Sequence, residues 1–381
     1  MGITLKSMAI MLVLVFLTAP YLIVSLPVKA GFRTLVVPDD YPTISSAIGN
    51  ATAGDTIFVK KGTYEEKTLE INKTLSLIGE DVNSTVVKIY ASILNVTQIL
   101  TQFWISLSNS IIINANDVRL SKLTIVTGGN IVATGDRIQI IGNNITMRNS
   151  DQGLSISGSY CNITDNTSDG LINLSGFHNT IARNSVYRIT INKDFNLISN
   201  NTVSGNGVKL SNANSNVVYG NNMLTTTGDY GLYIVENSSH NIIHNNNVSA
   251  LFRDVEINSD SAENNTFYHN NFLMQYGNDA ASLYTYNSTL VNFWDNGEEG
   301  NYWEDYNGTD ADRDGIGDTP YVIDGNNVDN YPLMFPYDIE DDTVVLPPPE
   351  PFPTALVTTV SVALVAVIGV GLLVYFKKRD Q

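Results

Sequence analysis

A run of aspartates near the C-terminal end has the spacing of a calcium-binding loop. In "DADRDGIGD", four carboxylates fall at positions 1, 3, 5 and 9 of an EF-hand-like loop, and Gly315 lies at its sharp turn. Hard oxygen ligands at alternate positions suit Ca²⁺, and a main-chain carbonyl is expected at position 7. The predicted ligands are Asp310, Asp312, Asp314, Ile316 and Asp318.

The loop departs from the calcium pattern at position 12, where Tyr321 replaces the bidentate glutamate. Asp324, three residues further on, could supply the missing carboxylate. The alternative is an acidic, solvated turn without an ion. We predict a structural calcium ion that stabilises the C-terminal cap of the domain.

Two histidines suggest a second, softer metal site. In "HNIIHNNNVS", His240 and His244 are four residues apart, but the repeat described below excludes a helical chelating pair. Aligning the repeats instead places His244 and His269 in one slot of adjacent repeats, ~4.8 Å apart at the backbone. Imidazoles suit copper or zinc. This copper hypothesis rests on two ligands only.

Two carboxylates raise the question of catalysis. Asp254 and Glu256 alternate on one predicted strand, with Arg253 beside them and Arg188 several repeats earlier. Glycoside hydrolysis needs two carboxylates about 5–9.5 Å apart, a spacing that this pair could meet. However, the flanking residues match no lyase, esterase or hydrolase motif, and such a pair on a strand is usually a solvated face. The sequence therefore assigns no catalytic residue.

The elements that position these residues belong to an internal repeat of about 17 to 25 residues. Each repeat holds a short alternating segment followed by an asparagine-rich one, such as "GLSIS" before "CNITDN" and "GLYIV" before "HNIIHNN". Apolar side chains recur with period two, as expected for a strand with one buried face. The predicted inward residues are Leu154 and Ile156, Ile172 and Leu174, Ile189 and Ile191, Val208 and Leu210, Leu232 and Ile234, and Val255 and Ile257.

Strands this short cannot bury an apolar face alone, so successive repeats must stack in parallel. Asparagine suits the corners because it tolerates left-handed backbone, and stacked asparagines can pass amide hydrogen bonds between repeats. Glycine, asparagine, threonine and β-branched residues argue against helical repeats. The sequence predicts an all-β chain, a right-handed parallel β-helix from about residue 34 to residue 290.

Composition limits the partners. The formal charge of −17 leaves no basic surface for nucleic acid, and it favours cations. The single cysteine, Cys161, excludes an intramolecular disulfide, and we interpret it as a small packed side chain.

The two ends predict export and anchoring. Residues 1–30 read as a signal peptide, with an uncleaved anchor as the alternative. Residues 31–290 form the solenoid and 291–338 its C-terminal cap, followed by an acidic, proline-rich stalk at 339–354. The uncharged run 355–376 is long enough for one transmembrane helix, with a core helix as the alternative, and the basic tail 377–381 should stay cytoplasmic. The predicted location is the cell membrane, with an extracellular ectodomain.

Fourteen N-x-S/T sequons are candidate glycosylation sites in an exported protein, although a chain this rich in asparagine produces some by chance. The acceptors are Asn50, Asn72, Asn83, Asn95, Asn144, Asn162, Asn166, Asn173, Asn200, Asn237, Asn247, Asn264, Asn287 and Asn307.

The opening segment, with "YPTISSAI", "GDTIFVKKGTY" and "KTLSLIGE", resembles the start of right-handed parallel β-helix proteins. Pectin methylesterases, pectate-lyase-like proteins and NosD-like proteins share this opening. The repeats and the closing "GNYWEDYNGTDADRDGIGDTPYVIDGNNVDNYPLM" look most like the NosD-like group. The resemblance implies a capping helix at residues 42–53, and it implies a possible role beside copper enzymes.

Aromatic residues near the calcium loop, from Phe293 to Tyr306, could form a sugar platform but are more typical of a plug at the solenoid end. The function that fits best is a non-catalytic module that binds carbohydrate or a surface protein. The alternatives are a polysaccharide lyase, hydrolase or epimerase, and a NosD-like accessory factor for copper-enzyme maturation.

Overall fold

The computed structural model describes residues 31–89, 110–148, 151–225, 230–273, 283–285 and 289–339. The predicted signal peptide, the stalk beyond residue 339, the transmembrane helix and the tail lie outside these ranges. Within them, none of the helices has the length and apolar character needed to cross a bilayer.

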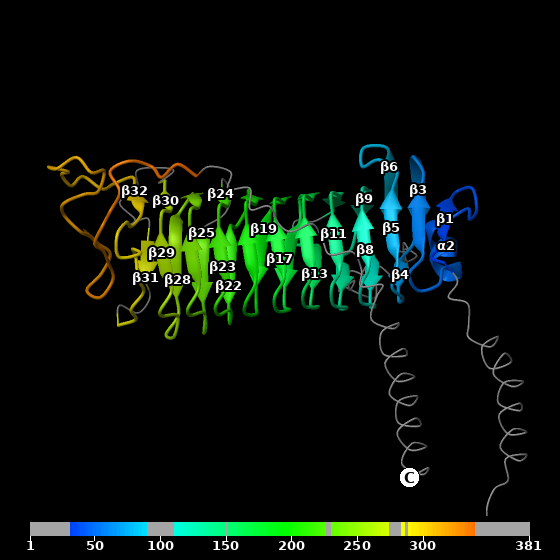
Figure 1. Cartoon of the computed structure of the whole chain (residues 1–381), viewed down its shortest axis with the longest axis horizontal. Coiled ribbons are helices and arrows are strands. Elements are labelled where there is room, and N and C mark those ends of the chain that lie inside the picture. Colours follow the sequence, from blue (N-terminus) through cyan, green and yellow to red (C-terminus); the bar gives the residue numbers. More distant parts are fainter. Residues whose placement is uncertain are drawn as a thin grey trace, which may run out of the picture.

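Three long sheets run the length of the molecule, and consecutive strands of a turn belong to different sheets (Figure 1). The first sheet contains β1 (Thr34–Val37), β2 (Thr56–Val59), β5 (Ser76–Gly79), β8 (Arg119–Ser121), β11 (Gln139–Ile141), β14 (Asn162–Thr164), β17 (Thr180–Ala182), β20 (Leu197–Ser199), β23 (Val217–Tyr219), β26 (Ile242–His244) and β29 (Thr266–Tyr268).

The second sheet contains β4 (Leu69–Ile71), β7 (Ile111–Ile113), β10 (Ile131–Ala133), β13 (Gly153–Ile156), β16 (Leu171–Leu174), β19 (Arg188–Ile191), β22 (Val208–Ser211), β25 (Tyr230–Val235), β28 (Arg253–Asn258) and β31 (Leu283–Thr285). The third contains β3 (Gly62–Glu66), β6 (Thr85–Ile89), β9 (Thr124–Thr127), β12 (Asn144–Met147), β15 (Thr167–Ser168), β18 (Ser185–Val186), β21 (Thr202–Val203), β24 (Asn222–Thr225), β27 (Asn247–Ala250), β30 (Asn271–Phe272) and β32 (Tyr302–Trp303). A separate antiparallel hairpin joins β33 (Tyr321–Val322) to β34 (Val328–Asp329).

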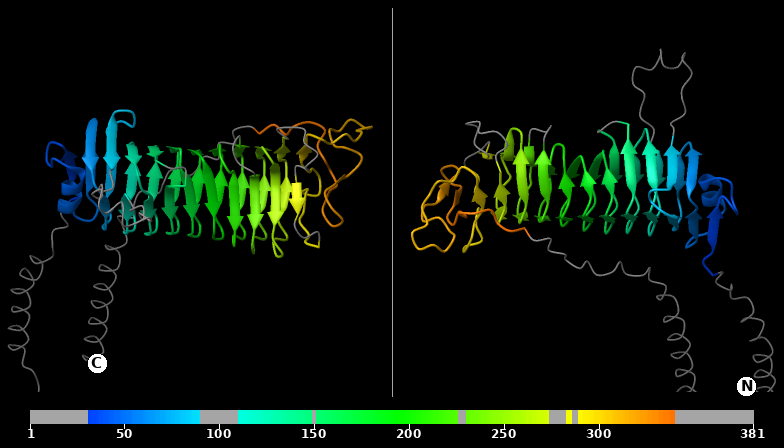
Figure 2. Two further views of the ribbon diagram at one scale, coloured as in Figure 1. Left: turned by 180° about the vertical axis from the view of Figure 1, so that it is seen from behind. Right: turned by 90° about the horizontal axis from the view of Figure 1, so that it is seen from above.

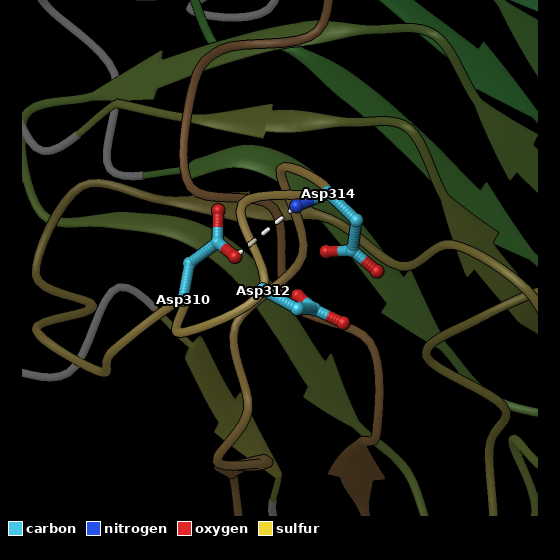
Figure 3. Close-up of side chains that lie close together, drawn as sticks. All are labelled: Asp310, Asp312 and Asp314. Carbon is cyan, nitrogen blue, oxygen red and sulfur yellow. Dashed lines mark hydrogen bonds between the residues drawn. The ribbon is translucent and has the colours of Figure 1, made fainter.

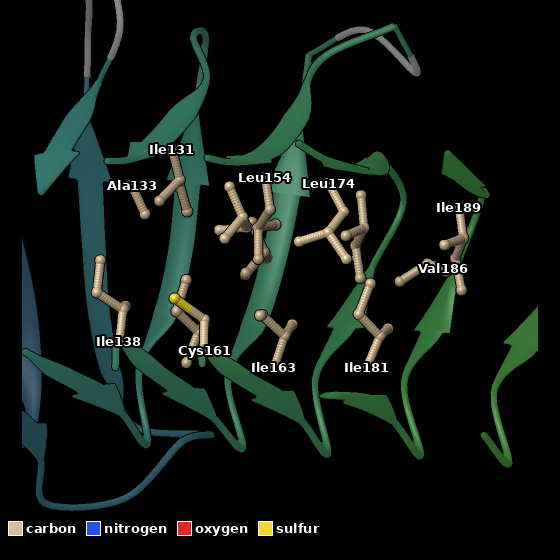
Figure 4. Close-up of a cluster of buried hydrophobic side chains, with 14 of the residues drawn as sticks. Ile131, Ala133, Ile138, Leu154, Cys161, Ile163, Leu174, Ile181, Val186 and Ile189 are labelled. Atoms are coloured by element: carbon tan, nitrogen blue, oxygen red, sulfur yellow. The ribbon is translucent and has the colours of Figure 1, made fainter. Parts of the chain in front are cut away.

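The predicted parallel β-helix is confirmed, since every pairing within the three long sheets is parallel. Figure 2 shows the sheets as the faces of one continuous rod. The predicted inward column is in register from β13 to β28: Leu154, Ile172, Ile189, Val208, Leu232 and Val255 are Cα partners in turn. These side chains are almost completely buried and form one core along the axis (Figure 4).

The N-terminal end is closed by the predicted helix, α2 (Ile44–Asn50). It is shorter than residues 42–53 because Thr43 is its N-cap, in a capping box with Ser46, and extended backbone resumes at Ala51. The carboxylate of Glu66 accepts hydrogen bonds from the first main-chain N–H groups, 2.7 Å from the nitrogen of Ile44. Negative charge at a helix N-terminus is stabilising.

Two buried asparagine ladders line two corners of the solenoid. In each, the main-chain N–H of one asparagine donates to the side-chain oxygen of the asparagine one turn later, and most side-chain amides add a second bond. Stacked amide bonds between repeats are therefore confirmed. The first ladder consists of Asn143, Asn166, Asn184, Asn201, Asn221, Asn246, Asn270 and Asn301. The second consists of Asn179, Asn196, Asn216, Asn241, Asn265, Asn292 and Asn327.

The left-handed backbone lies one residue before the ladder asparagines, which corrects the prediction that the stacked asparagines themselves adopt it. Arg183 (φ 54°), His178 (φ 55°) and Phe195 (φ 60°) each precede a ladder member. The tight corner thus takes many residue types, because its geometry is fixed by the amide bonds of the following asparagine rather than by its own side chain.

The C-terminal end is closed by an aromatic plug, as predicted. Trp294 and Trp303 are buried, Phe267 stacks on Trp294 with centroids 4.2 Å apart, and Tyr321 stacks on Trp303 at 4.4 Å. Phe293 is the exception, at 51% exposed. The third sheet continues to β32, so the solenoid extends past residue 290 into the segment predicted as cap.

Candidate functional site

A polar patch lies on the outer face of the second sheet, where three adjacent turns contribute a cation, an aromatic ring and a carboxylate in register. Lys209 of β22, Tyr233 of β25 and Glu256 of β28 are successive Cα partners. Their outward direction was predicted from the period-two pattern. We define the polar patch as these three residues with Tyr230, Arg253 and Asn258.

Aromatic contacts organise one half of the polar patch. The rings of Tyr230 and Tyr233 stack with centroids 4.7 Å apart, and the Nζ of Lys209 lies 5.4 Å from the Tyr233 ring. All three side chains are partly exposed. Burial raises the pKa of Tyr233, and the negative charge of Glu256 raises it further. Tyr233 therefore stays a hydroxyl donor and acceptor at neutral pH.

The other half of the polar patch is an ion pair. Arg253 donates to the carboxylate of Glu256, and the amide of Asn258 donates to the other oxygen at 3.1 Å. The side chain of Arg253 is 22% exposed, whereas that of Glu256 is 3% exposed. Arg253 therefore presents the surface of this pair, and Glu256 lies beneath it.

Asp254 is the second residue of β28 and is also buried, so the predicted solvated face for Asp254 and Glu256 is wrong. Its Oδ1 accepts a hydrogen bond from the main-chain nitrogen of Ala250 at 2.8 Å, and its Oδ2 has no partner among the described residues. Burial raises the pKa of this carboxyl to about 7, and the charges of Glu304 and Asp305 add to the effect. By strand register, Arg188 is three turns away from Asp254 and cannot complete a site with it.

The predicted calcium loop brings together three of its aspartates. Carboxylate oxygens of Asp310, Asp312 and Asp314 lie within 4.8 Å of one another (Figure 3). Oxygens of Asp310 accept hydrogen bonds from the main-chain nitrogens of Asp314 and Gly315, so part of the loop geometry is held by the protein itself. This is the only such carboxylate, histidine or cysteine group among the described residues.

The three other predicted calcium ligands have different partners. Asp318 accepts a hydrogen bond from the main-chain nitrogen of Ala311 at 2.8 Å. Asp324, the predicted substitute for a glutamate at position 12, instead accepts bonds from Asn327 and ends the second ladder. Ile316 pairs with Leu333 in an antiparallel bridge. The cluster of carboxylates in the structure therefore contains three of the six residues predicted as calcium ligands.

The predicted histidine pair is wrong in its alignment. His244 is the Cα partner of Tyr219 and Tyr268, and its ring stacks between theirs at 5.2 and 5.0 Å. His269 follows Tyr268, the strand partner of His244, so the two histidines are offset by one residue. The Nε2 of His269 lies 2.6 Å from a carboxylate oxygen of Glu299. The register argument for a copper site is therefore lost.

The predicted glycosylation sites differ in how far their asparagine side chains are exposed. Asn166 is 2% exposed, and its amide bonds to Ile140, Thr164 and Asn184 within the first ladder, so it is not an acceptor in the folded protein. Asn95 and Asn287 lie outside the described residues. The side chains classed as exposed are those of Asn50, Asn72, Asn83, Asn144, Asn237 and Asn307.

Cys161 is buried and reduced, as its interpretation as a packed side chain predicts, and burial raises the pKa of its thiol to about 11.

A surface feature that sequence reasoning missed is an exposed stack of rings. Tyr160, His178 and Phe195 occupy one corner position of successive turns, with centroids 5.1 and 5.3 Å apart. Because each ring covers the face of the next, this ridge offers ring edges rather than a flat stacking platform.

No protein-family model matches the chain, and no curated protein matches it. Solved structures similar to it include the A-module of the mannuronan C-5 epimerase AlgE6 from Azotobacter vinelandii, with 13% identity, a TM-score of 0.41, and coverage of 68% of this chain and 86% of that chain. An alginate lyase from Paenibacillus sp. str. FPU-7 has 12% identity, a TM-score of 0.40, and coverage of 71% and 97%. The PL6 family polysaccharide lyase Pedsa3628 from Pseudopedobacter saltans has 12% identity, a TM-score of 0.30, and coverage of 68% and 93%. At TM-scores this low, they give no information about the ligand or activity of this chain.

Proposed function

We propose that this chain is a cell-surface β-helix that binds carbohydrate through the polar patch without cleaving it. The observation that carries the proposal is the in-register column of Lys209, Tyr233 and Glu256. Stacked turns repeat every ~4.8 Å, close to the length of a sugar unit, so one extended glycan can contact several turns at once. Partly exposed tyrosines beside cationic side chains supply both apolar and hydrogen-bonding contact.

Binding is favoured over catalysis because the carboxylates of Asp254 and Glu256 are both buried and cannot reach a glycan at the surface. Glu256 is neutralised by Arg253 and lies under it, while Asp254 is buried near the start of β28. A general acid or base must reach the proton that it transfers. The groups that the polar patch does present are Lys209, Arg253 and the two tyrosines, which recognise hydroxyl and anionic groups.

A panel of neutral and uronate polysaccharides tests this proposal, with binding and chain length measured on the same samples. Lys209→Ala and Tyr233→Ala should each weaken binding about tenfold, which corresponds to about 1.4 kcal/mol. Thr180→Ala, on the first sheet, is the matched control and should bind like the wild type. Binding that is unchanged in both polar-patch variants contradicts the site, and shortened chains would establish the lyase or hydrolase alternative.

A calcium ion bound at Asp310, Asp312 and Asp314 is a second proposal, with a structural role. It is supported by the convergence of three carboxylates on a loop that also contacts the end of the solenoid, where Gly317 donates to Pro332. Three charges this close repel one another, and a divalent cation relieves that repulsion.

A further inference from the structure

A cavity of about 370 Å³ lies between the capping helix and the first strand of the second sheet. Both elements, α2 and β4, lie at the N-terminal end of the rod (Figure 1). Ile48 and Gly49 line the cavity from the helix, and Thr68, Glu70 and Asn72 line it from the strand and its flanks. This volume falls in the ~300–1,000 Å³ range of small-ligand sites.

The two walls of this cavity are tied together by Lys73. Its ammonium donates to the main-chain carbonyls of Ile48 and Ala51 at 3.2 and 3.1 Å. A cation is favourable there, because the C-terminal end of a helix carries negative partial charge. Gly49 leaves the helix wall open, since a Cβ at this position would meet no other part of the described chain within 4 Å. The space is therefore built into the fold of the cap.

Asn72 gives the cavity a covalent attachment point. It begins an N-x-T sequon with Thr74, and its side chain is exposed. Among the exposed sequon asparagines of the described chain, Asn72 is the one that lines this cavity. The nearby sequon at Asn50 differs, because its amide donates to the carbonyl of Ser46 at 2.9 Å. A sugar bonded to Asn72 starts at the cavity wall, so its local concentration there is high.

We propose that Asn72 carries an N-linked glycan whose first sugar occupies this cavity and holds α2 against β4. The donor is a lipid-linked sugar phosphate, which an exported chain meets. The bond from the anomeric carbon to the phosphate oxygen breaks, a bond to Nδ2 of Asn72 forms, and the amide loses one proton. The seated sugar places hydroxyl groups beside Thr68 and Glu70 and an apolar face against Ile48.

The consequence is a local increase in the stability of the N-terminal cap. Each turn of a solenoid contacts only its neighbours, so a sugar that bridges α2 and β4 protects these elements and leaves distant turns unchanged. The protected helix closes the core through Ile44 and Ala47, which are both completely buried. The proposal shares only the cell-surface location with the proposed function. A chain that binds no polysaccharide at the polar patch can still carry this glycan.

Peptide mass spectrometry and amide hydrogen exchange test the proposal on full-length protein purified from its native host. Mass spectrometry should find a glycan on Asn72. Asn72→Gln removes the glycan, and the amides of α2 should then exchange about tenfold faster, while those of β24 keep the wild-type rate. Asn83→Gln is the matched control, because it removes an exposed sequon that does not line the cavity. It should leave exchange in α2 unchanged.

Wild-type protein from a host without N-glycosylation separates the sugar from the asparagine side chain. Its α2 amides should exchange as fast as those of Asn72→Gln. An unmodified Asn72 in the native host, or equal exchange in α2 with and without the glycan, would overturn the proposal. Gly49→Leu tests the seat itself, because its side chain fills the cavity and should abolish the difference between glycosylated and unglycosylated protein. An undiminished difference would place the sugar outside the cavity and refute the proposed seat.

Discussion

The asparagine ladders and strand β28 both bury polar side chains in one solenoid, but these side chains find hydrogen-bond partners to different extents. Each ladder repeats one neutral group, so every side-chain oxygen accepts from the preceding turn and every ladder main-chain N–H donates to the next. At β28 the chain buries Asp254 and Glu256, and one oxygen of Asp254 has no partner among the described residues. Polar burial is inexpensive in the ladders and costly at β28, because a buried acceptor without a donor loses its hydration.

The ladders also have a direction. Within each ladder the main-chain N–H of an asparagine donates to the asparagine of the next turn, so the last asparagine of each ladder needs an acceptor of another kind. Asn327 donates to Asp324, and Asn301 donates to Asp329. A carboxylate fits because it only accepts when ionised. Burial raises the pKa of Asp329 to about 6, although the bonds from Trp303, Asn301 and Tyr331 oppose that shift.

The largest effect should come from breaking a ladder in its interior. Asn221→Ala removes the acceptor of two Asn201 donors and the donor to the carbonyls of Ile198 and Tyr219. At about 1–3 kcal/mol for each buried group left unpaired, the free energy of unfolding should fall by about 5 kcal/mol. Urea unfolding measures this, and Asn206→Ala, at a half-buried site outside both ladders, is the control. A loss equal to that of the control would show that the ladder bonds contribute little.

A substitution in β28 should have the opposite effect on stability, since Asp254→Asn removes a buried charge. The folded pKa of about 7 exceeds the ordinary 3.8, so the folded state binds this proton more tightly than the unfolded state. The wild type should therefore lose stability as pH rises from about 4 to 7, by up to about 4 kcal/mol from this carboxyl. The variant should lack that loss and be the more stable protein at pH 8.

Urea unfolding from pH 4 to pH 8, compared between wild type and Asp254→Asn, isolates this carboxyl from Asp329 and the surface acids. If the free energy of unfolding depends on pH in the same way in both proteins, burial of the Asp254 carboxylate does not destabilise the fold as proposed. Asp260→Asn, an exposed carboxylate nearby in sequence, is the matched control and should leave the pH dependence unchanged.

Calcium should add stability at the end where the ladders terminate. An ion at one hundred times its dissociation constant stabilises the folded state by about 2.7 kcal/mol. Asp312→Ala is the informative variant, because Asp310 and Asp314 also accept main-chain hydrogen bonds that shape the loop. Thermal unfolding should shift upward with calcium in the wild type and not in this variant. Equal shifts would place any bound calcium elsewhere.

The difference between the regular ladders and the irregular burial at β28 also explains what the sequence could predict. Period-two alternation gave the inward columns and their register, because core packing imposes it on every turn. It could not tell whether an outward side chain is covered, so it missed that Arg253 lies over Glu256. The three consecutive asparagines 245–247 hid which one joins the ladder, and the histidine alignment slipped by one residue. The Asn271–Tyr337 contact joins positions 66 residues apart and has no local signal.

The smallest expected effect is the absence of a glycan on a ladder asparagine, Asn166, in contrast to the exposed sequon at Asn144. Asn144 and Asn166 both begin sequons one turn apart, but Asn144 is exposed, whereas the Asn166 amide is saturated by buried partners. A glycan on Asn166 would remove one of its amide hydrogens and force sugar into the core. Peptide mass spectrometry of protein purified from its native host should find no glycan at Asn166 at any occupancy of Asn144. A glycan at Asn166 in the folded protein would mean that the first ladder opens at this turn.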